Sequence, residues 1–328
     1  MKKNVLGIEI GNSRLKIVEV NRGNVVRFQC YDLPDNMVQG GSVVSWDALV
    51  EVLRNCIHAG GFQAKLACLV LPESECYVKP LSMPPMTEAQ LMVNLPYEYQ
   101  DAINGEKDNY IFDYAMKGII NDENGNPVEM QLLGAMVHKD LIQKYTELFR
   151  KAGLKLIKAV PRPLALQVLA KYYNPEFYKQ DYAFLDLGND MTIIDYFHNG
   201  VYDVNSTIDS GVKAIVQAVA ETLHCDPHVA AGFLQTNKDD IIHNEALVNV
   251  YSTIAIEIMR GLNFYSFDNQ DNTLEKVYYY GGGAWITPFL EEIAGDISLE
   301  LLPISSLSPN TPADALINGA VALGACLD

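Results

Sequence analysis

A three-stranded pattern that occurs twice constrains the fold of this chain more than any other feature of its sequence. The stretches "LGIEIGNSRLKIVEVNRGNVVRF" and "AFLDLGNDMTIIDYFHNGVYDV" each begin with an apolar strand that carries one acid. A Gly-Asn turn, a second strand, a Gly-containing turn and a third strand follow in both. Gly11 and Gly23 are twelve residues apart, and so are Gly188 and Gly200. We interpret the two stretches as a duplication that opens each half of the chain, with two unrelated meanders as the alternative.

Helical patterns fill the segments that follow these strands. The stretch "SGVKAIVQAVAETL" has apolar residues at a helical spacing, and Ser210 is its expected N-cap. The stretch "DLIQKYTELFRKAGL" predicts a helix that ends at Gly153. The stretch "VYYYGGGAWITPFLEEI" predicts a strand, a triple glycine and a helix with Pro288 in its first turn. Strands that alternate with helices in this way indicate an α/β architecture in two similar halves.

The composition limits the ligands that the surface as a whole can bind. The 328 residues carry a formal net charge of −17, which disfavours nucleic acid and anionic lipid. We find no run of about 18 apolar residues, so we expect membrane contact only through a partner. Six cysteines without a CxxC pair and an early acid in place of a signal peptide favour a reducing compartment. One basic stretch is interpreted as a solvated face, with a docking patch as the alternative: Arg150, Lys151, Lys155, Lys158 and Arg162.

The glycines and acids of the repeat suit a nucleotide. Backbone N–H groups at a glycine turn can donate to phosphate oxygens, because glycine lets the backbone approach closely. The strand acids Glu9 and Asp186 can hold a magnesium ion through its bound water. The triple glycine, opening a helix, would add a contact to phosphate or adenosine, although it can also be a plain strand-to-helix turn. We therefore expect ATP or ADP with Mg²⁺ between the two halves.

The order of these elements resembles the actin-like ATPase superfamily, which includes actin, sugar kinases, the heat-shock chaperone ATPase domain and FtsA. A phosphate hairpin, a connecting helix, a second phosphate hairpin and the glycine turn follow one another, and the last connecting helix is "DALINGAVALGACL". The resemblance covers the whole chain. It implies an α/β protein with an actin-like (ribonuclease H-like) duplicated fold.

Four stretches are more closely similar to PilM, a family of type IV pilus assembly. They are "LSMPPMTEAQLMVNLPYEYQ", "IFDYAM", "MQLLGAMVHKDLIQKYTELFRKAGLKLIKAVPRPLAL" and "EIMRGLNFYSF". The resemblance implies an FtsA/PilM-type extra subdomain at residues 79–158. Residues 1–78 and 159–178 would form the first actin-like half. Residues 179–328 would form the second half, with the last helix, at about 314–327, returning to the first.

The PilM resemblance also implies a function. We expect a cytoplasmic scaffold, peripheral to the inner face of the cell membrane. Its extra subdomain would bind the N-terminal cytoplasmic tail of a PilN-like inner-membrane protein and link it to the motor ATPases of the pilus. Nucleotide would bias the conformation of this scaffold, and turnover would be at most very slow. The alternatives are a small-molecule kinase of the same superfamily and an FtsA-like filament or division protein.

The glycine chemistry and the resemblance together assign the candidate site residues. Those expected to bind the nucleotide are Gly11, Asn12, Ser13, Lys16, Gly188, Asn189, Asp190, Thr192, Gly211, Glu257, Arg260, Gly281, Gly282 and Gly283. Those expected to hold the metal are Glu9 and Asp186. Those expected to line a groove for the PilN-like tail are Leu81, Met83, Pro84, Leu95, Pro96 and Tyr97. The alternative is that the apolar residues of this stretch form the core of the subdomain.

Four positions depart from the pattern that the resemblance implies. Glu9 stands where aspartate is usual, so its carboxylate reaches one methylene further. Val160 stands where the first connecting segment usually has an acid, so a kinase-type base is missing there. Val212 follows Gly211 where two glycines are usual, and Asp190 adds negative charge beside the phosphates. These changes predict a weakened nucleotide site.

Overall fold

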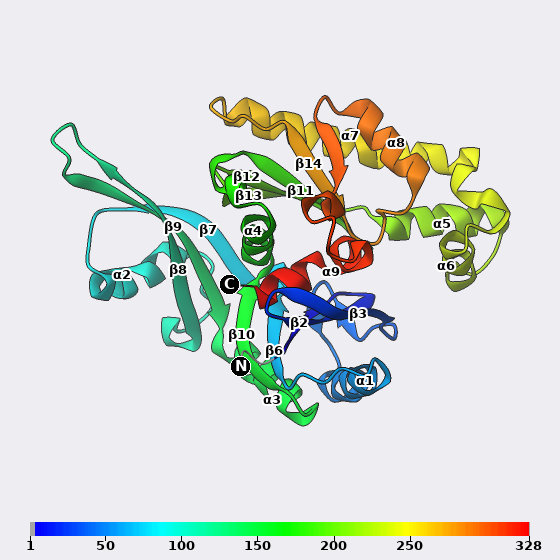
Figure 1. Ribbon diagram of the computed structural model, residues 1–328, viewed down its shortest axis with the longest axis horizontal. Coiled ribbons are helices and arrows are strands. Elements are labelled where there is room, and N and C mark those ends of the chain that lie inside the picture. The colour runs from blue at the N-terminus through cyan, green and yellow to red at the C-terminus, as the bar shows by residue number, and fades with distance from the viewer. Residues whose placement is uncertain (1–3, 328) are drawn as a thin grey trace. The chain divides into compact units, whose positions relative to one another are not determined.

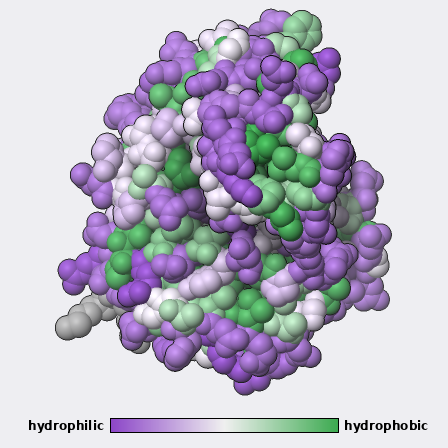
Figure 2. Space-filling model, turned by 90° about the vertical axis from the view of Figure 1, so that its right-hand side faces the viewer, coloured by the Kyte–Doolittle hydropathy of each residue, from purple (hydrophilic) through white to green (hydrophobic). Residues whose placement is uncertain are grey.

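The chain folds into two units, each with its own five-stranded sheet (Figure 1). The computed structural model describes residues 4–327. The first unit contains Met1–Leu169, Val201–Val204 and Val321–Asp328, and the second contains Ala170–Gly200 and Asn205–Ala320. Hydrophilic residues cover most of the face shown in Figure 2, as the strongly negative composition leads one to expect.

The sheet of the first unit combines an antiparallel meander with two parallel strands. β1 pairs antiparallel with β2, β2 pairs antiparallel with β3, and β1, β6 and β10 run parallel. The order across the sheet is β10 (Lys155–Pro161), β6 (Leu66–Leu71), β1 (Val5–Ile10), β2 (Arg14–Asn21) and β3 (Asn24–Asp32). A short hairpin of β4 (Val38–Gln39) and β5 (Ser42–Val43) follows the meander.

Helices cover both faces of this sheet. Alternate residues of β1, such as Leu6 and Ile8, join a core with apolar residues of α1 (Trp46–Ala59) and α3 (Lys139–Lys151). On the other face, α9 (Ala313–Cys326) approaches Gly7, and α4 (Arg162–Tyr173) packs against α9. A Cβ at Gly7 would lie 1.9 Å from the carbonyl oxygen of Ala322. A Cβ at Gly324 would lie 2.1 Å from the carbonyl oxygen of Ala165, so these backbones meet without side chains between them.

A smaller sheet in the first unit has a core of its own. Its strand order is β7 (Cys76–Met83), β9 (Pro127–His138) and β8 (Tyr110–Asn121), all antiparallel. α2 (Glu88–Asn94) and the 3₁₀ segment Leu95–Tyr99 carry the apolar residues that complete this core. α2 begins at a capping box, in which the side chains of Thr87 and Gln90 bond each other's backbone amides. Shorter 3₁₀ turns lie at Glu73–Glu75 and Lys107–Asn109.

The sheet of the second unit repeats the plan of the first. Its order is β13 (Val201–Ile208), β12 (Thr192–His198), β11 (Tyr182–Leu187), β14 (Lys276–Tyr280) and β15 (Glu300–Pro303). β11 pairs antiparallel with β12 and parallel with β14, as β1 does with β2 and β6. The common strand order confirms the duplicated α/β fold that the two sequence stretches predict.

Helices of the second unit pack on its sheet around a large apolar core. They are α5 (Val212–Leu223), α6 (Pro227–Gln235), α7 (Glu245–Asp268) and α8 (Thr287–Asp296), with 3₁₀ segments at Pro175–Lys179, Lys238–His243 and Ile304–Leu307. The rings of Tyr196 on β12 and Tyr265 on α7 stack at a centroid distance of 4.0 Å.

Two local predictions are wrong and two are correct. Gly211, not Ser210, caps α5, and no side chain bonds the first turn. The triple glycine forms a turn, and α8 begins only at Thr287, so the glycines do not open that helix. Gly153 follows α3 with a φ of +81°, the left-handed conformation that ends a helix. A proline does stand in the first turn of α8.

Candidate functional site

The first glycine turn is held by hydrogen bonds within its own unit. The amide of Gly11 donates to the carbonyl of Arg14 at 2.9 Å, which closes the β1–β2 hairpin. The side-chain oxygen of Asn12 accepts from the amide of Gly41 at 2.8 Å, and the carbonyl of Ser13 accepts from Leu33. Asn12 and Ser13 therefore have structural roles in the unit, whatever they add to ligand binding.

The acid and the lysine of the first hairpin form an ion pair. Glu9 and Lys16 lie opposite one another on β1 and β2, and their side-chain atoms Oε1 and Nζ are 2.6 Å apart. Both side chains are largely buried, at 16% and 15% exposure. Oε2 of Glu9 is buried without a hydrogen-bond partner among the described residues, which costs free energy unless a ligand or water bonds it. This oxygen is a fitting contact for water bound to a cation.

Magnesium at this position would have to keep most of its water. Residues 4–327 contain no group of three or more His, Cys, Asp or Glu side chains placed to hold a metal ion. Magnesium commonly binds one or two carboxylates together with several waters and substrate phosphates. Glu9 in the first unit fits that limited role and no fuller one.

In the second unit, the hairpin turn caps helix α5. The amides of Val212 and Lys213 donate to the carbonyls of Gly188 and Asn189 at 3.0 and 2.9 Å. A Cβ at Gly211 would lie only 2.5 Å from the carbonyl oxygen of Gly188, so this approach requires glycine. These amides are therefore engaged within the protein, and a phosphate would have to displace the turn to bind them.

The triple glycine lies against the end of β11, beside the same hairpin. Gly281 has a φ of +98°, and a Cβ there would lie 2.5 Å from Oδ1 of Asp186. The amide of Gly283 donates to the carbonyl of Leu187 at 2.9 Å. The structure thus brings Asp186, the Gly188 turn, Gly211 and the triple glycine together in one unit.

Two polar residues of the second hairpin have other partners. Thr192 is fully buried, and its hydroxyl donates to the carbonyl of Ser210 at 2.9 Å. It supports the turn and has no surface to offer a ligand in this conformation. Asp190 lies 3.6 Å from the ammonium of Lys213, which offsets part of its negative charge.

The two predicted ribose contacts form a pair on the surface of α7. Glu257 and Arg260 are one helical turn apart and bond each other, with side chains 45% and 66% exposed. Among the described contacts, none joins either side chain to the triple glycine. Their part in a nucleotide site stays a prediction.

The predicted tail-binding residues divide between the surface and the core. Leu81, Met83 and Leu95 are buried in the core of the small sheet, at 8%, 5% and 0% exposure. Tyr97 is 53% exposed, Pro84 is exposed, and Pro96 is half-buried. The three buried residues match the core interpretation and cannot line an open groove in this conformation. Several neighbouring apolar side chains are exposed instead: Met92, Val93, Met116, Ile119 and Ile120.

The basic stretch at residues 150–162 is not one solvated face. Arg162 is only 7% exposed, and its Nε and Nη2 donate to Oε1 of Glu73 at 2.9 and 2.8 Å. Lys158 donates to the carbonyl of Leu327. The remaining basic residues of the stretch, Arg150, Lys151 and Lys155, are exposed.

A family model decides what kind of protein this is. The model of the type IV pilus assembly protein PilM matches residues 7–308. The chain belongs to the PilM family. No curated protein matches it.

Solved structures share the fold of this PilM-family chain at low sequence identity. A PilM–PilN type IV pilus biogenesis complex matches with a TM-score of 0.80 and 20% identity, over 98% of this chain and 96% of that one. The ethanolamine utilization protein EutJ from Carboxydothermus hydrogenoformans matches with a TM-score of 0.60 and 17% identity, over 97% and 89%. MreB 5 of Spiroplasma citri bound to AMPPNP matches with a TM-score of 0.55 and 10% identity, over 99% and 95%. These likenesses show the actin-like ATPase fold.

One residue near the glycine turn escaped the sequence analysis of this PilM-family chain. Trp285 directly follows the glycine turn and Ala284, and it is 42% exposed, whereas its neighbour Ile286 is fully buried. An exposed indole beside a glycine turn is suited to contact a flat ring. The signal was present in the sequence, as an aromatic residue in "GGGAWI", but helical spacing alone does not show which side chain stays outside.

In the part of the chain that the structure describes, no helix is both long and apolar enough to span a bilayer.

Proposed function

We propose that this PilM-family protein is a scaffold of the type IV pilus machine that binds the cytoplasmic N-terminal tail of a PilN-like inner-membrane protein and links it to the pilus motor ATPases. Family membership carries the pilus assignment. The fold match to a PilM–PilN complex supports a partner of the PilN kind. Such a partner would hold the protein at the inner face of the cell membrane.

The small sheet supports the partner surface of this proposal. β8 is an edge strand, and on the described residues no further strand pairs with its outer side. Met116 and Ile119 on β8 lie opposite Leu132 and Met130 of the core, yet they are 48% and 53% exposed. An extended peptide could add to this edge through main-chain hydrogen bonds and place alternate apolar side chains beside them. The proposed tail surface is therefore Met116 and Ile119 together with Tyr97.

Peptide binding tests this surface. A synthetic cytoplasmic tail of a PilN-like protein from the same organism should bind the purified protein. Ile119→Asp together with Met116→Ser should weaken that binding at least about tenfold, or about 1.4 kcal/mol. Val26→Asp is the matched control, because Val26 is also 53% exposed on a strand but lies on β3. Undiminished binding by the double variant, with an unchanged melting temperature, would refute the placement. An unmutated protein without any affinity for the tail would refute the partner.

A nucleotide is the second part of the proposal. The actin-like fold occurs in an MreB structure with bound AMPPNP. In this chain the Gly188 turn, Gly211 and the triple glycine would face the phosphates and adenosine, and Trp285 would contact the base. Lys16 of the first unit would neutralise phosphate charge, while Glu9 and Asp186 would bind water of a magnesium ion. The cation would supply charge neutralisation, and this chain would supply a cationic side chain and glycine turns that leave room for the phosphates.

Calorimetry with ATP and magnesium tests the nucleotide part. The unmutated protein should bind, and Lys16→Ala should weaken binding by about 1 to 3 kcal/mol, the size of a lost charge-assisted contact. Lys238→Ala is the control, because Lys238 is a lysine on a different segment. Turnover should stay far below the enzyme median of about 10 per second. No heat of binding at millimolar ATP would rule the nucleotide out and leave the scaffold proposal intact.

A further inference from the structure

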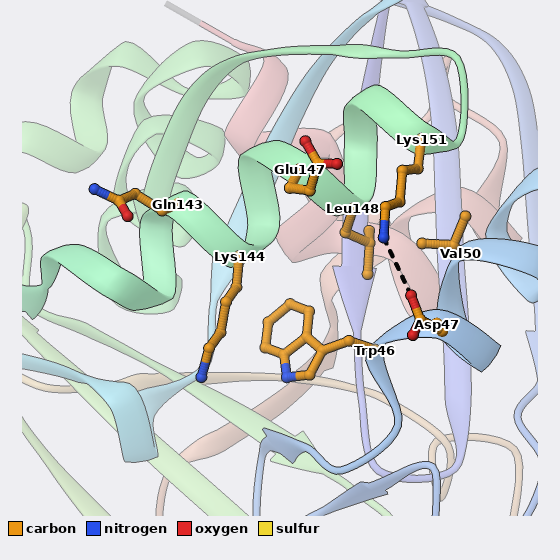
Figure 3. Close-up of a pocket in the computed structure, with 8 residues that line it drawn as sticks. All are labelled: Trp46, Asp47, Val50, Gln143, Lys144, Glu147, Leu148 and Lys151. Carbon is orange, nitrogen blue, oxygen red and sulfur yellow. Dashed lines mark hydrogen bonds and ion pairs between the residues drawn. The ribbon is translucent and has the colours of Figure 1, made fainter.

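A pocket lies between helices α1 and α3 of the first unit (Figure 3). Its volume is about 280 Å³, and its lining contains no residue of the candidate nucleotide or tail sets. The floor is apolar, with the indole of Trp46 beside the buried side chains of Val50 and Leu148. The ring of Tyr145 meets the indole edge-on at a centroid distance of 5.0 Å, which fixes the orientation of the indole.

The four charged residues that line this pocket, Asp47, Lys144, Glu147 and Lys151, sum to zero, but one of them has no ion-pair partner among the described residues. Lys151 pairs with Asp47 at 3.1 Å, and Glu147 pairs with Arg150 at 2.6 Å. Lys144 extends beside the indole in Figure 3, and its ammonium lies 5.9 Å from the ring centroid. Within residues 4–327, no carboxylate forms an ion pair with Lys144. Its positive charge can therefore pair with an acidic group of a ligand that also contacts the indole of Trp46.

The two helices that frame the pocket carry a small positive charge together, because α1 contributes −1 from Asp47, Glu51 and Arg54 and α3 contributes +2. α3 carries four basic residues and two acidic ones, a balance of +2, whereas the whole chain carries −17. The members of this set are Lys139, Lys144, Arg150, Lys151, Asp140 and Glu147. The preference for an acidic partner therefore rests on the unpaired ammonium of Lys144, which would pair with a carboxylate and repel another cation.

We propose that the α1–α3 pocket is a docking site for an amphipathic acidic helix of a partner protein. An apolar side chain of that helix lies on Trp46, above Val50 and Leu148, and a flanking carboxylate pairs with Lys144. A groove between two helices is the kind of surface that takes the apolar stripe of a third. This goes beyond the tail proposal, because it assigns a second partner surface with a different ligand chemistry.

Fluorescence can test the proposal, because the chain has two tryptophans. In Trp285→Phe, emission comes from Trp46. Three synthetic helical peptides of about 18 residues serve as probes: one with a leucine stripe flanked by glutamates, one with the same stripe flanked by lysines, and one with serines replacing the leucines. The glutamate peptide should shift Trp46 emission and bind at least about tenfold tighter than the lysine peptide. The serine peptide should produce no shift.

Charge reversal at the rim supplies the decisive comparison. Lys144→Glu should abolish or invert the preference for the glutamate peptide. Lys238→Glu is the matched control, because the ammonium of Lys238 also lies over an aromatic ring, 4.2 Å from the centroid of Phe233 in the second unit. It should leave the preference unchanged.

Three outcomes would overturn the proposal. They are equal binding of the glutamate and lysine peptides, no binding of either at millimolar concentration, and an unchanged preference in Lys144→Glu. A concentration-dependent dimer, seen by sedimentation and lost in Lys144→Glu, would assign the pocket to a second copy of the chain instead. Binding of the PilN-like tail, measured on the same variants, should not change and is therefore read separately.

Discussion

Asp181 shows how one buried carboxylate can fix several segments of the second unit. It is 8% exposed and accepts from the amides of Asn199 and Thr273, each at 2.7 Å, while His198 lies 3.1 Å away. Burial acts to raise the pKa of Asp181. The bonds from Thr273, Asn199 and His198 outweigh that effect and hold the pKa below its ordinary value of 3.8.

Replacing this carboxylate should destabilise the unit in a pH-dependent way. Because the folded-state pKa is lowered, the stabilisation is complete above the unfolded pKa of 3.8 and is lost as pH falls through the folded value. Asp181→Asn should lower the free energy of unfolding by about 1 to 3 kcal/mol at pH 7, and the difference should shrink below pH 3.8. Urea unfolding across this range measures it. A difference that grows as pH falls would contradict the assignment.

At the same scale, the sequence analysis assigned Glu9 to a metal and Lys16 to a nucleotide and did not anticipate that the two side chains pair. The pairing of Glu9 with Lys16 follows from two strands joined by a tight turn, which places residues symmetric about that turn opposite one another. Leu95 is buried and Val93 is exposed because of the way in which this segment packs on its sheet. The local sequence does not determine that packing. Apolar residues in a groove and in a core look alike in sequence, so the tail set mixed both kinds.

Helix α5 and its hairpin show how a tertiary contact replaces a local signal. Ser210 has the chemistry of an N-cap, but the carbonyls of the Gly188 turn take the first amides of the helix. The sequence does not reveal this contact, because its two parts are more than twenty residues apart. The triple glycine was misjudged for a related reason, since turn hydrogen bonds from Ala284 to Gly281 and from Ile286 to Gly283 precede α8.

Gly211→Ala should break the hydrogen bonds between the Gly188 turn and the first amides of α5. Its Cβ would lie within 2.7 Å of the carbonyl oxygens of Gly188 and Asn189, so the turn and the helix must separate. We expect a loss of at least about 2 kcal/mol in the free energy of unfolding. Gly232→Ala in α6 is the control, because open space surrounds that position. It should be neutral or stabilise by up to about 1 kcal/mol.

Across the whole molecule, the repeat was enough to predict two sheets of one design. The two sheets have the same strand order, as duplication predicts, and the general preference for right-handed crossovers between parallel strands leaves few other arrangements. Helix α9 is shared between the units: its part up to Ala320 belongs to the second unit, and its part from Val321 belongs to the first. The division lies next to Gly319, where the backbone of α9 leaves the helical conformation with a φ of −128°, so two helical segments meet there.

Gly7→Ala should weaken the first unit more than the second. The new Cβ would meet the carbonyl oxygen of Ala322 at 1.9 Å, so α9 must move off β1. Each unit holds one tryptophan, Trp46 or Trp285, which lets each be followed alone after the other is changed to phenylalanine. The free energy of unfolding that is read from Trp46 fluorescence in a denaturant titration should fall by at least about 2 kcal/mol. Equal shifts at both tryptophans would show that the units unfold together.

The contact between α9 and β1 also sets an order on synthesis. The ribosome makes most of the first unit early, but the strip of helix that lies on Gly7 comes after residue 320. Until that strip emerges, one face of the earliest sheet has no cover, and a nascent chain would present it to chaperones. A message cut short before this point would yield a protein with an unfinished first unit, which proteases could recognise. Completion of the first unit therefore waits for residues that are translated after nearly all of the second.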